Sequence, residues 1–150
     1  MTEESALEQV EEFFHRQIPI TRAMGLRVVA CDEQGFTVEA PVALNSNHLR
    51  TAFGGSINAV ATLAAYGFLW MELKEQSPHV VIAESSIRYL RPVHETIRAA
   101  CSGPTSQELA RFRAAFKTHG KARIDLRVSV LEGAETAAEF QGSFVARRPR

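Results

Sequence analysis

The stretch NHLRTAFGGSINAVATLAAYGFLWM, residues 47–71, decides the fold of this chain. It joins a polar loop to a glycine pair and then to the only long apolar run with helical character. We expect a helix over roughly 54–76 that is apolar on nearly every face between Ala59 and Met71, and a helix of that kind must be surrounded by other elements. The rest of the chain therefore has to supply those surroundings.

Gly54 and Gly55 stand where this helix should begin. The first N–H groups of a helix have no partner within the helix, and they carry the positive end of its dipole. Without side chains at this point, a ligand can approach them closely, and they could polarise a carbonyl oxygen or hold an anion. The glycine pair is equally consistent with a loop end that lets the helix pack against a strand.

The segments that follow and precede the long helix predict a sheet around it. Two short β-rich runs over 26–31 and 36–41 form a hairpin, with the turn at 32–35. Four further strands are expected over 80–90, 96–102, 122–131 and 137–147. The last two alternate apolar and polar residues, so each should bury one face, and the turn at 132–135 pairs them.

Two further helices complete the expected architecture. Apolar residues at helical spacing predict an amphipathic helix over 3–18, stopped by Pro19, and Thr105 with Glu108 has the form of a capping box that begins a short helix. We therefore predict a single α+β domain over 1–150, with an N-terminal helix over 3–18 and a core over 24–147. In this domain a curved antiparallel sheet wraps around one long apolar helix.

Composition excludes several classes of function. The chain has 150 residues with 17 basic and 17 acidic side chains, so no global field favours nucleic acid or an anionic membrane. The apolar helical run is shorter than the roughly 20 residues that span a bilayer. The first residues are acidic where a signal peptide would be basic, which favours the cytoplasm. Cys31 and Cys101 lack metal-ligand neighbours and are interpreted as reduced thiols, and we expect no metal site.

The order of elements, the loop-Gly-Gly-helix and the strand end IRYLRP at 87–92 resemble the hotdog-fold thioesterases. More narrowly, NSN at 45–47, TAFGGS at 51–56 and YGFLW at 66–70 resemble the thioesterase domain at the C-terminus of the acetyltransferase-like protein YiiD. The resemblance covers roughly residues 18–147. It implies hydrolysis of an acyl thioester, with coenzyme A or an acyl carrier protein as part of the substrate and no further cofactor.

The resemblance also implies roles for residues of the loop and helix. Backbone N–H groups at the helix start hold the thioester carbonyl, which places that role at Gly54 and Gly55. An asparagine ahead of them, here Asn47, positions water or the carbonyl; its alternative role is to form the turn. The carboxylate that many members carry two turns into the helix is replaced by Thr62, which cannot serve as a base but could donate a hydrogen bond in the pocket or bond its own backbone.

Glu84 is the carboxylate that we favour for activating water. It lies within the apolar strand segment 80–84, where burial would raise its pKa toward neutrality. Alternation puts Glu84, Ser86 and Arg88 on one face of the strand, and Ser85, Ile87 and Tyr89 on the other. The alternative is a structural ion pair between Glu84 and Arg88.

The remaining candidates bind the substrate. Arginine and lysine suit the phosphates of coenzyme A, and aromatic or hydroxyl side chains suit the acyl end. These candidates are Phe53, Ser56, Ser86, Arg88 and Arg91, with Arg111, Arg113, Lys117 and Lys121 as further cations and Tyr66, Phe68 and Trp70 as further aromatics.

One sheet around one helix leaves an exposed edge strand, so we expect a homodimer or tetramer through sheet edges. In the resembling family the sites lie at that interface, so Asn47 of one subunit would face Glu84 of the other. The leading hypothesis is an acyl thioesterase, and the alternative is a noncatalytic module that binds acyl thioesters. A dehydratase of the same fold would need a histidine with a nearby carboxylate, and the sequence around His48, His79 or His94 does not resemble one.

Overall fold

The computed structural model describes residues 3–32 and 35–150 and consists of helices on a single antiparallel sheet. The elements are α1 (Glu3–Gln17), α2 (Ile20–Ala23), β1 (Arg27–Asp32), β2 (Gly35–Pro41), η1 (Val42–Leu44), α3 (Gly54–Leu73), η2 (Lys74–Gln76), β3 (His79–Tyr89), β4 (Thr96–Cys101), α4 (Ser106–His119), β5 (Lys121–Glu132) and β6 (Glu135–Arg147). The short α2 was not expected from the sequence.

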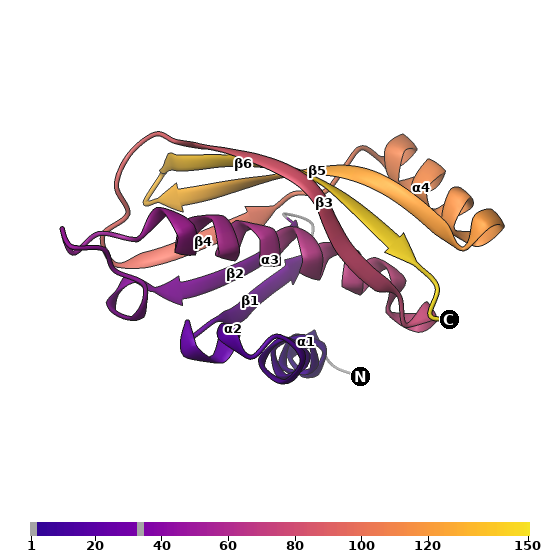
Figure 1. Cartoon of the computed structure of the whole chain (residues 1–150), viewed down its shortest axis with the longest axis horizontal. Helices are drawn as coiled ribbons and strands as arrows, with labels where there is room; N and C mark the ends of the chain where they lie inside the picture. Colours follow the sequence, from indigo (N-terminus) through magenta and orange to yellow (C-terminus); the bar gives the residue numbers. More distant parts are fainter. Residues whose placement is uncertain (1–2, 33–34) are drawn as a thin grey trace.

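The sheet is six-stranded with the order β1-β2-β4-β5-β6-β3, and it curves around α3 (Figure 1). This confirms the α+β architecture predicted from the sequence. The β1–β2 and β5–β6 hairpins are both present, although Glu33 and Gln34 of the first expected turn lie outside the described residues. The predicted capping box is also present, because the Thr105 side chain accepts from the Glu108 N–H group and the Glu108 carboxylate accepts from the Thr105 N–H group.

The core lies between α3 and the inner face of the sheet. Along β5 the buried and exposed residues alternate, as the sequence pattern predicts, and Leu126 and Val128 are buried. Phe140 and Phe144 of β6 and Val60 of α3 are buried in the same cluster. The opposite, outer face of β5 carries charged and hydroxyl side chains that are exposed to solvent.

The expectation that other elements surround the long helix is wrong along one stripe of α3. Gly55 is exposed, and Ala59, Thr62, Tyr66 and Trp70, which follow it at spacings of three or four residues, are only half-buried. The physical reason is that the sheet covers the helix from one side, and α1 reaches only the far end of the other side. We call these five residues the open stripe of α3.

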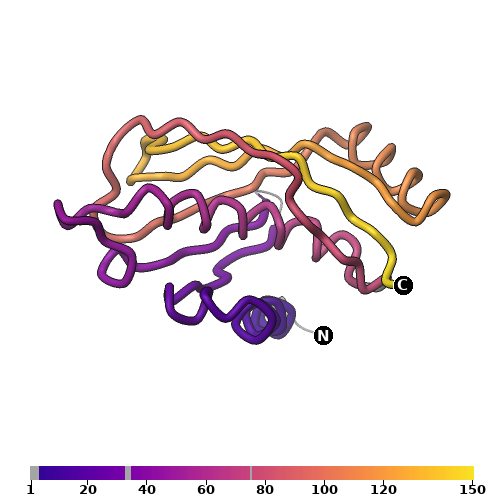
Figure 2. Tube along the Cα trace, viewed as in Figure 1, coloured from indigo at the N-terminus to yellow at the C-terminus, as the bar shows by residue number. Residues whose placement is uncertain are grey.

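The chain doubles back after α3, so β3 returns toward the start of that helix (Figure 2). β3 is the outermost strand on its side of the sheet, and nearly all of its residues are exposed. Val81 and Ile82 are exposed to 60% and 39%, which is unusual for large apolar residues in a strand. No helix within the described ranges is long and apolar enough to cross a membrane.

The other outer strand, β1, is covered by α1. The Val28 N–H group donates to Glu11 Oε1 at 2.9 Å, and His15 Nε2 lies 2.8 Å from the Leu26 carbonyl oxygen. These side chains form hydrogen bonds with backbone groups that would otherwise lie unpaired at an open edge of the sheet. Among the described residues, β3 therefore presents the edge of the sheet that no helix covers.

Replacing Glu11 tests whether the contact between α1 and the β1 edge stabilises the fold. Glu11→Ala should lower the free energy of unfolding by about 1–3 kcal/mol, because it leaves the Val28 N–H group without its acceptor. Urea denaturation measures the change. The matched control is Glu12→Ala, whose side chain is 72% exposed and lies 3.9 Å from Arg16, and which should change stability by less than about 0.5 kcal/mol. Equal losses in both variants would contradict the assignment.

Candidate active site at the start of α3

The start of α3 presents backbone N–H groups that no side chain caps. Phe53 is the N-cap residue with extended backbone angles (φ −66°, ψ 132°), and its side chain makes no capping hydrogen bond. The Ile57 N–H group donates to the Phe53 carbonyl oxygen at 3.0 Å and closes the first helical turn. The N–H groups of Gly54 and Gly55 precede that bond, so they are the orphan donors at the positive end of the helix.

The glycine pair fits tightly between two aromatic rings. A Cβ atom at Gly55 would lie 2.5 Å from the ring of Phe53, whereas a Cβ atom at Gly54 would lie 3.4 Å from Tyr89. Tyr89 Oη donates to the Gly54 carbonyl oxygen at 2.9 Å, which ties the end of β3 to the helix start. Sequence reasoning missed Tyr89; its position in the strand-end motif IRYLRP was the available signal.

The loop before α3 is held in place by Asn47. Asn47 Oδ1 accepts from the N–H groups of Leu49 (2.8 Å) and Thr51 (3.1 Å). Its Nδ2 group donates to Thr51 Oγ1 at 2.9 Å and to the Ala52 carbonyl oxygen at 3.4 Å. Of the two roles left open by the sequence, the structure therefore shows the turn-forming one. Water positioning by Asn47 stays a prediction, and it would compete with bonds that the side chain already makes.

Asn45 anchors the same loop to the sheet. Its Nδ2 group donates to the carbonyl oxygens of Met24 (3.0 Å) and Pro41 (2.8 Å), and its own carbonyl oxygen accepts from the Phe53 N–H group at 2.8 Å. Asn45 is buried, so these bonds form away from solvent. The helix start is thus fixed from the loop side by Asn45 and from the strand side by Tyr89.

Thr62 and Asn58 lie on α3 just below the glycine pair. Thr62 Oγ1 donates to the Asn58 carbonyl oxygen at 2.8 Å, which is the backbone-bonding alternative that the sequence left open. The Oδ1 atom of Asn58 is buried and has no hydrogen-bond partner in the described structure. Sequence reasoning missed Asn58, although an amide in an otherwise apolar helix was a signal.

The burial expected for Glu84 is wrong. Its side chain is 75% exposed and accepts from Arg123 Nη2 at 2.9 Å. The alternative, an ion pair with Arg88, is also wrong, because Arg88 lies beside Glu139 instead. The cause is a register shift of β3 against β6 between Ile82 and Glu84. A bulge at this point turns Glu84 to the outer face of the sheet, away from α3, whereas simple alternation from Val80 would have directed it inward.

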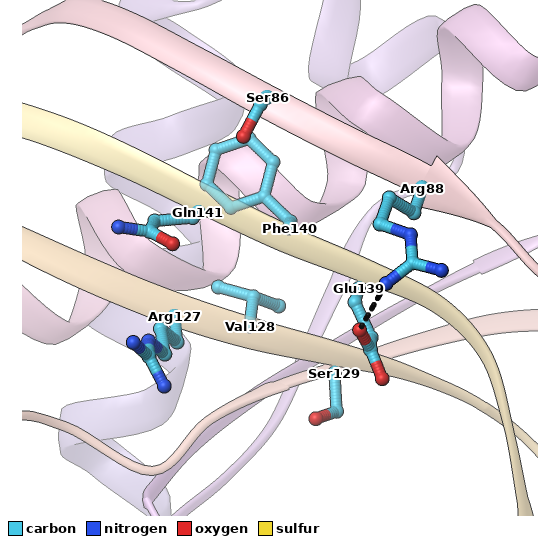
Figure 3. Close-up of a pocket in the computed structure, with 8 residues that line it drawn as sticks. All are labelled: Ser86, Arg88, Arg127, Val128, Ser129, Glu139, Phe140 and Gln141. Atoms are coloured by element: carbon cyan, nitrogen blue, oxygen red, sulfur yellow. Dashed lines mark ion pairs between the residues drawn. The ribbon is translucent and has the colours of Figure 1, made fainter.

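Ser86 and Arg88 also lie on the outer face. They line a cavity of about 450 Å³ with Glu139 and Gln141, and Arg88 Nη1 lies 4.0 Å from Glu139 Oε2 (Figure 3). Arg91 forms an ion pair with Glu135. The structure therefore brings Phe53, Gly54, Gly55 and Ser56 together with Asn47, and it separates Glu84, Ser86 and Arg88 from them.

Burial raises the pKa of two side chains, Cys101 and Tyr66. Desolvation raises the pKa of Cys101 to about 11, partly offset by a hydrogen bond with the Gly103 backbone, so this thiol stays protonated at neutral pH. Burial also raises the pKa of Tyr66 above its ordinary value. Within the residues that the structure describes, no group of acidic, histidine and cysteine side chains could hold a metal ion.

Comparison with known proteins places this chain in a family. The family described as "Putative thioesterase (yiiD_Cterm)" matches residues 7–148. A protein of unknown function from Chlorobaculum tepidum is 30% identical with a TM-score of 0.91, covering 99% of this chain and 98% of that one. A "putative thioesterase" from Shewanella oneidensis is 27% identical with a TM-score of 0.83, covering 97% and 99%.

A "probable thioesterase" from Pseudomonas aeruginosa is 19% identical with a TM-score of 0.80, covers 95% of each chain, and supports the fold alone. These proteins share with this chain the six-stranded sheet curved around a long helix, which is the hotdog fold. The chain therefore belongs to the YiiD C-terminal thioesterase family and has the hotdog fold.

Proposed function

We propose that this protein hydrolyses acyl thioesters of coenzyme A or of an acyl carrier protein. The observation that carries the proposal is the start of α3, where no side chain caps the N–H groups of Gly54 and Gly55 and where Gly55 is exposed. Preorganised N–H donors stabilise the negative charge that develops on a carbonyl oxygen during acyl transfer. Membership of the thioesterase family makes the thioester the substrate class for such a site.

The proposed reaction needs no cofactor beyond the substrate's own coenzyme A or carrier protein. The thioester carbonyl oxygen accepts hydrogen bonds from the helix start, and a water oxygen attacks the carbonyl carbon. The tetrahedral oxyanion is held by the same donors until the carbon–sulfur bond breaks. The water supplies the hydroxyl group of the acid product, and its proton ends on the thiol that leaves.

We assign the orientation of that water to Asn58. It follows Gly54 by four residues and Gly55 by three, so it lies directly beneath both on the helix surface. Helical side chains tilt toward the N-terminus, which directs the amide toward the proposed carbonyl position. A buried acceptor without a donor costs roughly 1–3 kcal/mol, and a hydrogen bond from water would remove that cost. Thr62 fixes the backbone carbonyl oxygen of the same residue.

We also propose that the protein is a homodimer paired through β3. This strand is open along its length and carries Val81 and Ile82 on its surface, while α1 covers the opposite edge of the sheet. Antiparallel pairing of two β3 strands would extend the sheet and satisfy both open edges. It would also bring the partner close to the open stripe of α3. Assembly into a tetramer and a cytoplasmic location stay predictions.

A specific observation favours the alternative, a module that binds acyl thioesters without hydrolysing them. Thr62 stands where many hotdog thioesterases have a carboxylate, and Glu84 lies on the outer face of the sheet in a pair with Arg123. Neither Thr62 nor Glu84 therefore supplies a base at the start of α3. Under this alternative, Gly54 and Gly55 would bind the carbonyl, and the thioester would survive.

Hydrolysis of acyl-coenzyme A thioesters from acetyl to hexadecanoyl distinguishes the two functions. We expect turnover by the wild type and at least a tenfold loss of kcat in Asn58→Leu, a change of similar size that removes the buried acceptor. Glu84→Gln should retain wild-type activity, because its side chain faces away from α3. A loss in Glu84→Gln but not in Asn58→Leu would return the role to Glu84.

Asn47→Ala is the third variant in this test. Loss of its loop bonds should lower both activity and thermal stability, whereas a residue that only orients water would lower activity alone. Absence of turnover with every coenzyme A thioester and with acyl carrier protein thioesters, despite binding of both, would support the noncatalytic module.

A further inference from the structure

A cavity of about 600 Å³ lies at the far end of the open stripe, between α1, the last turns of α3 and the start of β3. Its walls include Phe13 and Gln17 of α1, Ile18 directly after that helix, Tyr66 and Trp70 of α3, and Val80 of β3. The rings of Phe13 and Trp70 are 5.3 Å apart, and those of Phe14 and Tyr66 are 5.8 Å apart. Aromatic walls of this kind suit an apolar ligand.

The open stripe connects this cavity to the start of α3. Gly55, Ala59, Thr62, Tyr66 and Trp70 follow one another at helical spacing, and each is half-buried or exposed. Their neighbours Val60, Ala61 and Ala64 on the sheet side are buried. The stripe has no charged side chain and two hydroxyl groups, that of Thr62, which is bonded to the helix backbone, and that of Tyr66, which lies at the cavity. It is therefore an apolar track that begins at the carbonyl site and ends in the cavity.

We propose that the acyl chain of the thioester lies along the open stripe and ends in the cavity between α1 and α3, so that the site takes chains of about 14 carbons or more. The position of the carbonyl rests on the proposed function. A helix rises 1.5 Å per residue, so Tyr66 lies about 16 Å and Trp70 about 22 Å along the axis from Gly55. An extended alkyl chain gains roughly 1.25 Å per carbon, from bonds of about 1.5 Å.

The length of the open stripe then sets which acyl chain lengths the site prefers. About 13 carbons reach Tyr66 at the mouth of the cavity, and about 18 reach Trp70, by the same helical rise. Each buried CH₂ group contributes about 0.8 kcal/mol, so chains that enter the cavity gain affinity over chains that stop on the stripe. A partner helix in a dimer could cover the stripe, but the cavity is concave, and a thin alkyl chain fits it better than a helix does.

Trp70 is the only tryptophan in the chain, so its fluorescence reports directly on this cavity. The probes are S-hexyl-, S-hexadecyl- and S-octadecyl-coenzyme A thioethers, which cannot be hydrolysed, used below their micellar concentrations. We expect the hexadecyl and octadecyl probes to shift Trp70 emission to shorter wavelength and to reduce its quenching by acrylamide at least twofold. The hexyl probe should bind without either change. Equal responses to all three probes, or no response to any, would overturn the proposal.

A variant that partly fills the cavity tests the same proposal through the rate of hydrolysis. Gln17→Phe places a bulkier apolar side chain at the wall and should lower kcat/KM for hexadecanoyl-coenzyme A at least tenfold while leaving hexanoyl-coenzyme A within twofold. Gln9→Phe is the matched control, because Gln9 is exposed on the same helix and is not among the residues that line the cavity. Equal losses for both chain lengths in Gln17→Phe would contradict a chain-end site.

The two measurements separate this inference from the proposed function. Hydrolysis of all chain lengths at similar rates with no response of Trp70 would overturn the chain site and leave the thioesterase activity standing. A length-dependent response of Trp70 with no hydrolysis would support the chain site and reject the hydrolytic activity in favour of binding.

Discussion

Gly54→Pro is expected to lower kcat/KM for acyl-coenzyme A hydrolysis by about 100-fold or more, the usual cost of removing one oxyanion donor. Proline removes the N–H group of residue 54, which makes no hydrogen bond in the described structure. The first helical position tolerates proline, and Phe53 already has the extended backbone that a residue before proline prefers. Thermal stability should therefore be unchanged or slightly higher, so activity and folding separate.

Gly54→Ala is the matched control for this variant. Alanine keeps the N–H group, and its Cβ atom would lie 3.4 Å from the Tyr89 ring, an ordinary contact. We expect this variant to retain most of the activity and to gain stability from the better helix propensity of alanine. Similar activity in the alanine and proline variants would show that the Gly54 N–H group does not bind the carbonyl oxygen.

Val81→Lys combined with Ile82→Lys is expected to abolish dimer formation. The two side chains are exposed to 60% and 39% on opposite faces of the open strand, and lysine on an edge strand opposes pairing with another chain. Light scattering should then give the 16.6 kDa of one chain instead of twice that mass. Activity should also fall when the dimer is lost, because the partner would no longer cover the open stripe of α3.

Ile20→Lys combined with Leu44→Lys controls for charge in the dimer test. These apolar side chains are exposed to 63% and 60%, but they lie in α2 and η1, outside the strands of the sheet. The control should keep the mass and activity of the wild type. If light scattering gives the mass of a single chain for the wild-type protein, that result alone would contradict pairing through β3.

Much of the fold follows from local patterns in the sequence. Apolar periodicity predicts α1, α3 and the strands, and alternation along β5 correctly separates its buried residues from its exposed ones. The capping box at Thr105 and Glu108 predicts the start of α4. These features depend on interactions between residues that are close in sequence, and such interactions can be inferred from a single sequence.

The candidate site was predictable only in part. The open N–H groups of Gly54 and Gly55 follow from the glycine pair at a helix start, and the structure places them there uncapped. The role of Asn47 could not be decided, because an amide that forms a turn and one that orients water have the same sequence. Its four hydrogen bonds within the loop appear only when the backbone is placed.

Apart from the short α2, the sequence by itself determined the helices and strands, their order, and the glycine pair at the uncapped helix start, because each depends on residue type and local spacing. Tertiary structure decided the face on which Glu84 lies, since a bulge between Ile82 and Glu84 shifts the register of β3 against β6 and local alternation does not reveal it. It also decided which stripe of an all-apolar helix stays open. That depends on how far the sheet and α1 reach around α3, which is set by contacts between residues far apart in the chain.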